Sequence, residues 1–232
     1  MPVYQLDEGL WFPKPKYGEP DGLLAVGGDL SVNRLLLAYS HGIFPWYAYQ
    51  LYDEPHWYCP MDRFVIFPKE IHISHSMKQL MRQGKYHITM NQDFKGVINA
   101  CSKADSRNTD MGAWLGPQMI RAYKQLHKMG IAHSVEVWEA KETENNTSIP
   151  LRLVGGLYGI DLNGAFFGES MFSFVPSASK LALIHLAQHL EKKGYSFIDC
   201  QFETPHLLSM GGRHITYEEY MAILNANAHK QE

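Results

Sequence analysis

Apolar and polar positions along the chain form blocks whose spacing predicts a series of helices and strands. In residues 117–130, PQMIRAYKQLHKMG, the apolar residues recur with the period of an amphipathic helix. A helix is also expected over residues 32–41, because Asp29 and Ser31 are candidate N-caps and Gly42 is a candidate stop. Between these helices, the pattern predicts a strand at 63–68, a short helix within 74–86, a strand from residue 86 and a helix over 92–102.

The pattern of apolar and polar residues in the second half of the chain predicts antiparallel strands, a helix and one more strand. Residues 132–140 and 151–173 read as strands, and DLNG at 161–164 is a plausible tight turn between two of them. A helix over 177–194, closed by Gly194, precedes the stretch YSFIDCQFETPH (195–206). Asp199 and Gln201 interrupt the apolar run of that stretch. Because side chains on a strand alternate, these two are expected to point the same way and Cys200 the opposite way.

This order of elements predicts an α+β fold, in which helices cover the faces of a sheet. Residues 1–61 are rich in turn formers and aromatic residues, and they are expected to form a small domain that packs on something larger. Residues 62–232 are expected to form the main domain. The polar stretch KETENNTS (141–148) is predicted to be a flexible excursion between strands.

Composition is that of an ordinary globular protein. The chain has 232 residues, of which 45% are hydrophobic and 19% charged, with a net charge of −3. A nucleic-acid partner would therefore have to be bound by a local basic patch. Three cysteines without Cys-x-x-Cys spacing argue against a disulfide framework and favour a reducing, cytoplasmic location. No signal peptide and no membrane span are expected.

Several kinds of chemistry are disfavoured by the motifs. His185 and His189 share a helical face, but Leu186 stands where a metalloprotease motif requires Glu, and no metal is expected. The sequence has neither a Gly-x-Ser-x-Gly elbow nor a recognisable Cys/His pair. The glycines near residue 155 lie within predicted strands, which excludes a dinucleotide-binding turn there.

Three polar residues stand out in predicted inner strands: Glu169, Asp199 and Gln201. Gly168, next to Glu169, would allow a ligand or another backbone to come close. An unpaired buried carboxylate is costly, so Glu169 needs a partner. The three side chains could make structural hydrogen bonds at the ends of strands, or they could line a cleft for a cationic or amine-bearing substrate.

Basic and aromatic residues leave a similar choice open. The segment from 63 to 85 carries one acid, Glu70, and five basic residues: Arg63, Lys69, Lys78, Arg82 and Lys85. A second basic row lies on the helix at 117–130: Arg121, Lys124 and Lys128. Either row could be a solvated helix face or a contact to a phosphate backbone. Trp46, Trp57 and Tyr58 could be core anchors or could stack on an unpaired base.

Several motifs, in order, resemble one known family. GLLAVGGDLSVNRLLLAYSHGIFPW, LVGGLYGIDLNGAFFGESMFS, ASKLAL, and IDCQ followed by PHLLSMG are similar to the bacterial leucyl/phenylalanyl-tRNA–protein transferases over nearly the whole chain. The resemblance implies a main domain of the GCN5-related N-acetyltransferase (GNAT) type. It also implies transfer of Leu, Phe or, less readily, Met from aminoacyl-tRNA to the α-amine of proteins that begin with Arg or Lys, which marks them for degradation. No cofactor is implied, and a monomer is expected.

The resemblance also assigns residues. Asp199 would orient Gln201 and help hold the attacking amine, Gln201 would assist deprotonation of the amine or position the ester, and Glu169 would bind an amino group. The residues matching the amino-acid pocket are Trp114, Leu157, Phe166, Leu186 and Ile198. Tyr39 and Trp46 match positions for the terminal adenosine of the tRNA, and the acceptor-stem phosphates would lie on Lys78, Arg82 and Lys85. Whether the protein or the leaving hydroxyl of the tRNA acts as the base is left open.

The chain departs from the family pattern at AWLGP (113–117), at WYCPMDR (57–63) and in the long stretch at 141–149, which leaves the preference among Leu, Phe and Met open. Two other functions are compatible with the residues. One is an acetyl-CoA-dependent N-acetyltransferase, although FVPSASK (174–180) lacks the Gly-rich turn that would meet a pyrophosphate. The other is a non-catalytic module that binds aminoacyl-tRNA.

Overall fold

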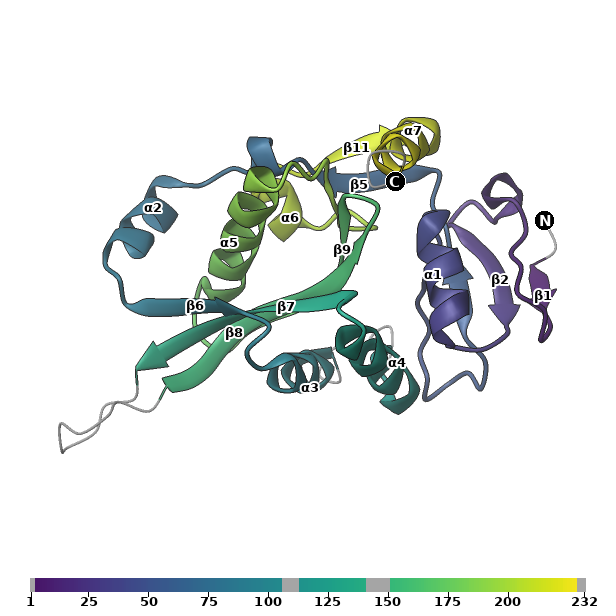
Figure 1. The fold of residues 1–232 in the computed structure, drawn as a ribbon, viewed down its shortest axis with the longest axis horizontal. Helices are drawn as coiled ribbons and strands as arrows, with labels where there is room; N and C mark the ends of the chain where they lie inside the picture. Colours follow the sequence, from purple (N-terminus) through teal and green to yellow (C-terminus); the bar gives the residue numbers. More distant parts are fainter. Residues whose placement is uncertain (1–2, 106–112, 141–150, 229–232) are drawn as a thin grey trace.

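The computed structural model of the protein describes residues 3–105, 113–140 and 151–228. It contains two sheets, a four-stranded sheet near the N-terminus and a larger one of seven strands (Figure 1). The seven strands lie in the order β11-β5-β10-β9-β8-β7-β6, and of these neighbours only β10 and β9 are parallel. The expected α+β class, with a mixed sheet and flanking helices, is confirmed. The excursion predicted at 141–148 lies outside the described residues.

The strands of the large sheet are β5 (Asp62–Ile66), β6 (Tyr86–Met90), β7 (Ala132–Ala140), β8 (Leu151–Leu162), β9 (Ala165–Ser173), β10 (Ile198–Asp199) and β11 (Arg213–Thr216). The helices of this part are α2 (His75–Arg82), α3 (Phe94–Asp105), α4 (Pro117–Lys128), α5 (Ala178–Lys192), α6 (Pro205–Ser209) and α7 (Tyr217–Ala228), with a 3-10 turn at Pro68–Glu70. The predicted tight turn joins β8 to β9. Asn163 and Gly164 both have positive φ there, as a two-residue hairpin turn requires.

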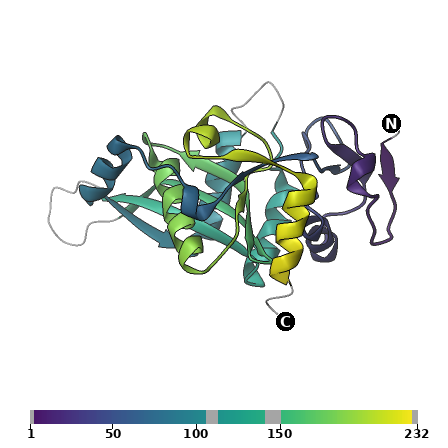
Figure 2. The same cartoon turned by 90° about the horizontal axis from the view of Figure 1, so that it is seen from above.

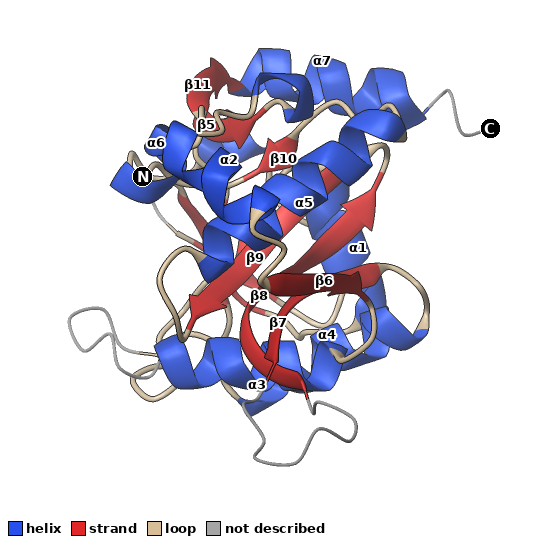
Figure 3. Cartoon of the chain, turned by 90° about the vertical axis from the view of Figure 1, so that its left-hand side faces the viewer, coloured by secondary structure: helices blue, strands red, loops and turns tan. Residues whose placement is uncertain are grey.

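Helices cover both faces of the large sheet. Helix α5 crosses one face, and α3 and α4 cover the other (Figure 3). Alternation along β8 explains the two layers: Leu157 packs with the α5 side and Tyr158 with the α3 and α4 side. Gly155 lets the start of α5 come close, since a Cβ there would lie 2.4 Å from the Ala178 Cβ.

The N-terminal domain is built on the small sheet, in the order β1-β2-β4-β3. Its elements are β1 (Tyr4–Leu6), a 3-10 turn at Pro15–Tyr17, β2 (Leu23–Gly27), α1 (Val32–Ser40), β3 (Phe44–Pro45) and β4 (His56–Tyr58). The Ser31 hydroxyl caps α1 by accepting from the Arg34 N–H, as the sequence predicts. Buried residues of α1 and β4 pack in one continuous core with those of α3 and α4. A domain boundary after residue 61 stays a prediction.

Two views at right angles place the N-terminal domain at one end of the molecule and α2 at the opposite end (Figures 1 and 2). No helix in the described ranges is both long and apolar enough to cross a membrane. Within those same ranges, no three His, Cys, Asp or Glu side chains are grouped so that they could hold a metal ion.

Candidate active site

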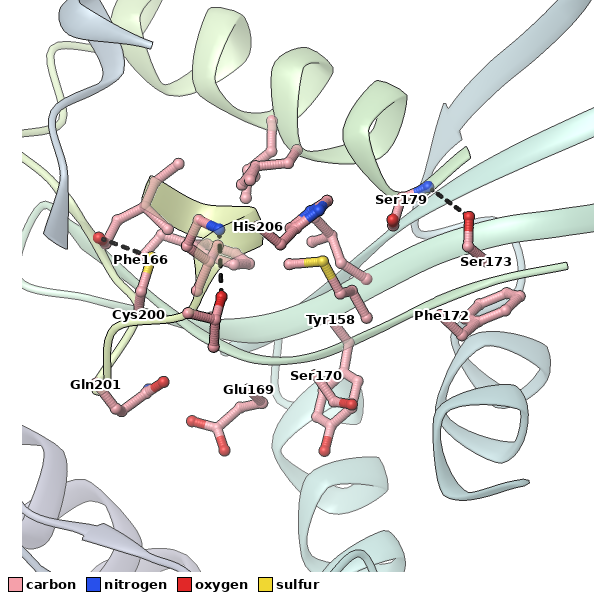
Figure 4. A pocket seen from close by; sticks show the side chains of 18 of the residues that line it. Tyr158, Phe166, Glu169, Ser170, Phe172, Ser173, Ser179, Cys200, Gln201 and His206 are labelled. Atoms are coloured by element: carbon pink, nitrogen blue, oxygen red, sulfur yellow. Dashed lines mark hydrogen bonds between the residues drawn. The ribbon is translucent and has the colours of Figure 1, made fainter. Parts of the chain in front are cut away.

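Two cavities meet between the large sheet, α5, α6 and the N-terminal domain. The first has a volume of about 520 Å³ and is walled mainly by apolar side chains of β8, β9, α5 and β10. The second, of about 340 Å³, is walled by aromatic side chains of β3 and of the loops before α4 and α6. Five residues line both cavities: Glu169, Cys200, Gln201, Thr204 and Leu207. Figure 4 shows Glu169 and Gln201 next to each other at one end of the first cavity, with Ser173 and Ser179 at the other.

The Glu169 carboxylate is hydrogen-bonded by two buried tyrosines, one from helix α1 and one from helix α4. The Tyr39 hydroxyl of α1 donates to one carboxylate oxygen (2.7 Å) and the Tyr123 hydroxyl of α4 donates to the other (2.6 Å). Burial raises the pKa of Glu169 to about 7, although both hydroxyls act to lower it. The pKa values of the tyrosines are themselves raised well above the usual range by burial and by Glu169, so both remain donors. Glu169 is therefore poised to change charge near neutral pH.

Asp199 is fully buried and lines neither cavity. Arg63 of β5 donates to both of its oxygens, at 2.9 Å from Nε and 2.6 Å from Nη2. The Tyr220 hydroxyl donates to the same carboxylate at 2.9 Å. The prediction that Asp199 helps hold the attacking amine is wrong, because its oxygens are engaged inside the protein and face away from the cavities.

Arg63 is itself enclosed. Its guanidinium lies between the rings of Phe44 and Tyr220, 4.8 and 4.9 Å from their centres. Burial opposes its charge, but Asp199 outweighs burial and raises the pKa of Arg63 above its usual value. The interpretation of the whole 63–85 segment as a phosphate-binding surface is therefore wrong for Arg63, which has no exposed surface.

Gln201 reaches the cavities through an unusual backbone conformation. Strand β10 ends at Asp199, and Gln201 has a φ of +60°, in the left-handed region. The Asp199 carboxylate accepts from the Gln201 N–H at 2.9 Å and so fixes this turn. Asp199 and Gln201 consequently do not point the same way, and Cys200 lines the cavities rather than facing away from them. Burial raises the pKa of the Cys200 thiol, which disfavours the thiolate a nucleophile would need.

Four of the five predicted pocket residues line the first cavity: Leu157, Phe166, Leu186 and Ile198. Trp114 does not. It lines the second cavity with Trp46 and Phe202, because the segment before α4 lies beside β3. Its assignment to the amino-acid pocket stays a prediction, and the first cavity is apolar without it.

The two residues matched to the terminal adenosine have different surroundings. Trp46 is partly exposed in the second cavity, where it contacts the rings of Tyr58 and Phe202 (5.4 and 5.2 Å between centres). Tyr39 is fully buried and lines neither cavity. A direct contact between Tyr39 and the nucleotide is not compatible with this position, and what Tyr39 contacts instead is Glu169.

The basic residues assigned to the acceptor stem lie on and after α2. Lys78 and Arg82 are exposed there. Lys85 is also exposed but is paired with Glu139, at 2.9 Å. All three are at the opposite end of the molecule from the N-terminal domain (Figures 1 and 2). Their contact with tRNA stays a prediction.

Three residues of the site were missed by reasoning from the sequence. Tyr123 reads as an ordinary buried position of an amphipathic helix, and nothing in the sequence marks its hydroxyl as a partner of Glu169. Arg63 is 136 positions away from Asp199 in the sequence. Tyr220 lies in helix α7, where nothing in the sequence signals a function. Only the fold brings these side chains together.

Comparison with known proteins identifies the family of the chain. The profile of the family described as leucyl/phenylalanyl-tRNA protein transferase matches residues 65–225, and the profile of its N-terminal domain matches residues 28–61.

Proteins named leucyl/phenylalanyl-tRNA–protein transferase are similar to this chain over most of their length. The one from Desulforapulum autotrophicum is 45% identical over 232 residues (100% of this chain, 95% of that protein). The one from Syntrophobacter fumaroxidans is 45% identical over 227 residues (98% and 92%). The one from Nitrosospira multiformis is 48% identical over 202 residues (87% and 81%). The chain therefore belongs to the leucyl/phenylalanyl-tRNA–protein transferase family.

Proposed function

We propose that this protein transfers Leu, Phe and, less readily, Met from aminoacyl-tRNA to the α-amine of proteins that begin with Arg or Lys, which marks them for degradation. The reaction needs no cofactor. The observation that carries the proposal is the meeting of an apolar cavity and an aromatic cavity at Glu169 and Gln201. An aminoacyl-adenosine has the same two parts, joined by the ester that reacts.

The donor fits across this junction. The amino-acid side chain enters the first cavity, against Leu157, Phe166, Leu186 and Ile198. The terminal adenosine enters the second, where Trp46 and Trp114 offer rings for stacking. The ester carbonyl then lies beside Gln201. An apolar pocket separates near-isosteres by only about 1–3 kcal/mol, so tolerance of Met beside Leu is expected.

The chemistry requires one bond to form and one to break. The nitrogen of the acceptor amine attacks the ester carbonyl, the C–O bond to the ribose breaks, and the proton lost by the amine ends on the ribose hydroxyl that leaves. An α-amine has an ordinary pKa of about 8, so a usable fraction is neutral at cellular pH without a strong base. The protein mainly holds the two reactants together.

Each residue of the junction has a separate role. Gln201 positions the ester and accepts a hydrogen bond from the attacking amine through its side-chain oxygen. Ionised Glu169 binds an amino group of a substrate. Asp199 acts on neither substrate directly. It fixes the backbone of Gln201, and Arg63 and Tyr220 fix Asp199.

The acceptor stem of the tRNA would be held by its phosphates, independent of base sequence. Lys78 and Arg82 are exposed cations on α2 and supply one such surface, with Lys85 beside them once it leaves Glu139. We also propose that the main domain is of the GNAT type. The support is the β9–α5–β10 unit, a parallel pair of strands joined by a helix. Three free thiols support a reducing cytoplasmic location, and a monomer is proposed.

The test is transfer in a purified system. The protein is incubated with labelled Leu-tRNA, Phe-tRNA or Met-tRNA and a peptide that begins with Arg, and the product is identified by mass. An N-acetylated form of the same peptide and one that begins with Asp serve as controls. Addition of Leu or Phe to the first peptide alone is expected. Absence of transfer from all three tRNAs would refute the proposal, and micromolar binding of acetyl-CoA would favour an N-acetyltransferase instead.

A further inference from the structure

A third cavity, of about 320 Å³, lies between the loop after β3 and the start of α4. Three tyrosines line it from the loop: Tyr47, Tyr49 and Tyr52. Gln118 and Arg121 line it from α4, and the Asp53 carboxylate completes the wall. Aromatic rings, a guanidinium, an amide and a carboxylate thus surround one space.

The cavity offers polar groups that the protein itself does not use. Tyr47 is only 6% exposed, yet its hydroxyl has no hydrogen-bond partner among the described residues. This hydroxyl is not one of the fully enclosed unpaired polar atoms of the described chain, and Tyr47 lines the cavity, so the hydroxyl can bond a ligand there. Gln118 and Arg121 likewise make no hydrogen bond or ion pair within the described parts of the chain. These groups are available to a ligand.

Packing keeps the space well defined. The ring of Tyr49 lies against Gly116, and a Cβ added at that glycine would come within 2.5 Å of the ring. Tyr52 packs on His56, with 4.4 Å between ring centres. Any side chain at residue 116 would displace the Tyr49 ring.

This cavity is the immediate neighbour of the second one. Trp46 lines the second cavity and the next residue, Tyr47, lines the third. On the other wall, Trp114 lines the second cavity and Gly116 the third. The same two short segments therefore border both spaces.

We propose that the third cavity binds the nucleotide that precedes the terminal adenosine of the donor, a cytidine in tRNA. This inference rests on the proposed function, which puts the adenosine in the second cavity. The pyrimidine base stacks on the tyrosine rings and Arg121 binds the phosphate that links the two nucleotides. Asp53 repels a phosphate, but it accepts a hydrogen bond from the exocyclic amine of cytosine, which uracil lacks.

The test compares three small donors in the same transfer assay: the phenylalanyl esters of adenosine, of the dinucleotide CpA and of UpA. For the wild-type protein, kcat/KM is expected to be about tenfold higher with CpA than with adenosine, the worth of one charge-assisted contact. UpA is expected to fall between them. Arg121→Ala should lower the ratio of CpA to adenosine several-fold, and Asp53→Ala should abolish the difference between CpA and UpA. Lys95→Ala removes an exposed cation of α3 and should keep both ratios.

Equilibrium binding of unacylated CpA and adenosine, followed by calorimetry, tests the inference without any transfer. Tighter binding of CpA that depends on Arg121 supports it. Equal binding of the two by the wild-type protein, or an equal loss for both in Arg121→Ala, overturns it. Transfer from phenylalanyl-adenosine reports on the proposed function alone, so failure of the cytidine site leaves that function standing.

Discussion

Arg63 and Asp199 form a fully buried pair in which Nε and Nη2 of the arginine each bond one oxygen of the carboxylate, at 2.9 and 2.6 Å. Tyr220 and the backbone of Gln201 bond the same two oxygens. A carboxylate that accepts from four such donors has no remaining capacity to bind a substrate amine. The pair is a support for the Gln201 turn, built from strand β5 on one side and strand β10 on the other.

Removing Arg63 alone should strongly destabilise the folded protein. Arg63→Met leaves the Asp199 charge buried without its partner, and a loss of about 3–5 kcal/mol in the free energy of unfolding is expected. The double variant Arg63→Met, Asp199→Leu has no buried charge and should recover much of this loss. It should still transfer poorly, because the Gln201 N–H has lost its acceptor. Thermal unfolding and kcat are measured on both variants, and wild-type kcat in a folded double variant would contradict the supporting role.

The side chain and the backbone of Gln201 can be separated by one substitution. Gln201→Gly accepts a φ of +60° without strain, so the turn and the fold should be kept or slightly stabilised, by up to about 1 kcal/mol. Transfer should nevertheless fall by about 100-fold, since a positioned polar group at the ester is lost. The Kd for aminoacyl-tRNA should change little. If kcat stays within a few-fold of wild type while the turn is intact, the side chain has no part in the reaction.

Asp199 and Gln201 also show which features of the site could not be predicted from the sequence. Alternation along a strand correctly separates Ile198 and Cys200, which line the first cavity, from Asp199, which does not. It fails at Gln201 because a left-handed residue that is not glycine ends the alternation, and no local signal announces it. The pairing of Arg63 with Asp199 spans 136 positions, so local patterns carry no information about it.

Local chemistry predicted other features well. The serine cap of α1 and the turn of Asn163 and Gly164 follow from residue type and spacing. The residues that line the first cavity were named from the family resemblance and not from local chemistry. Trp114 lines the second cavity, because the path of the segment before α4 depends on its packing beside the N-terminal domain. Tyr39 was misplaced because a tyrosine at the end of a helix can equally face a ligand or a buried carboxylate.

The pH dependence of transfer should report on Glu169. Its pKa of about 7 means that the carboxylate forms as the pH rises through neutrality, and binding of an amino group should rise with it. The Tyr123 hydroxyl lowers this pKa, so Tyr123→Phe should move the midpoint of the pH profile to higher pH. Tyr158→Phe is the matched control, because the buried Tyr158 hydroxyl has no hydrogen-bond partner in the described chain. A midpoint that is the same in all three proteins would exclude Glu169 as the titrating group.

The same shift predicts a cost in stability. The folded protein holds the Glu169 proton more tightly than the unfolded chain, whose glutamates titrate near 4.5, so stability is lost as the pH rises from about 4.5 to about 7. Glu169→Gln removes this loss. At pH 8 the variant should be more stable than wild type by about 1–2 kcal/mol, a value below the full shift because the carboxyl is open to the cavities. Below pH 4.5 that advantage should vanish. Chemical unfolding at the two pH values measures the difference, and an advantage that is the same at both would not come from ionisation.

The exposed cations of α2 predict how salt affects the binding of tRNA. Lys78 and Arg82 would each neutralise a phosphate, so reversing both charges should weaken binding and lower the slope of log K against log salt by about 1.5–2. Transfer from phenylalanyl-adenosine should be unaffected, because this small donor has no acceptor stem. Lys95→Glu on α3 controls for the change in net charge. Because α2 and the N-terminal domain lie at opposite ends of the molecule, an unchanged slope in Lys78→Glu, Arg82→Glu would place the acceptor stem on the α4 side, over Arg121 and its neighbours (Figure 1).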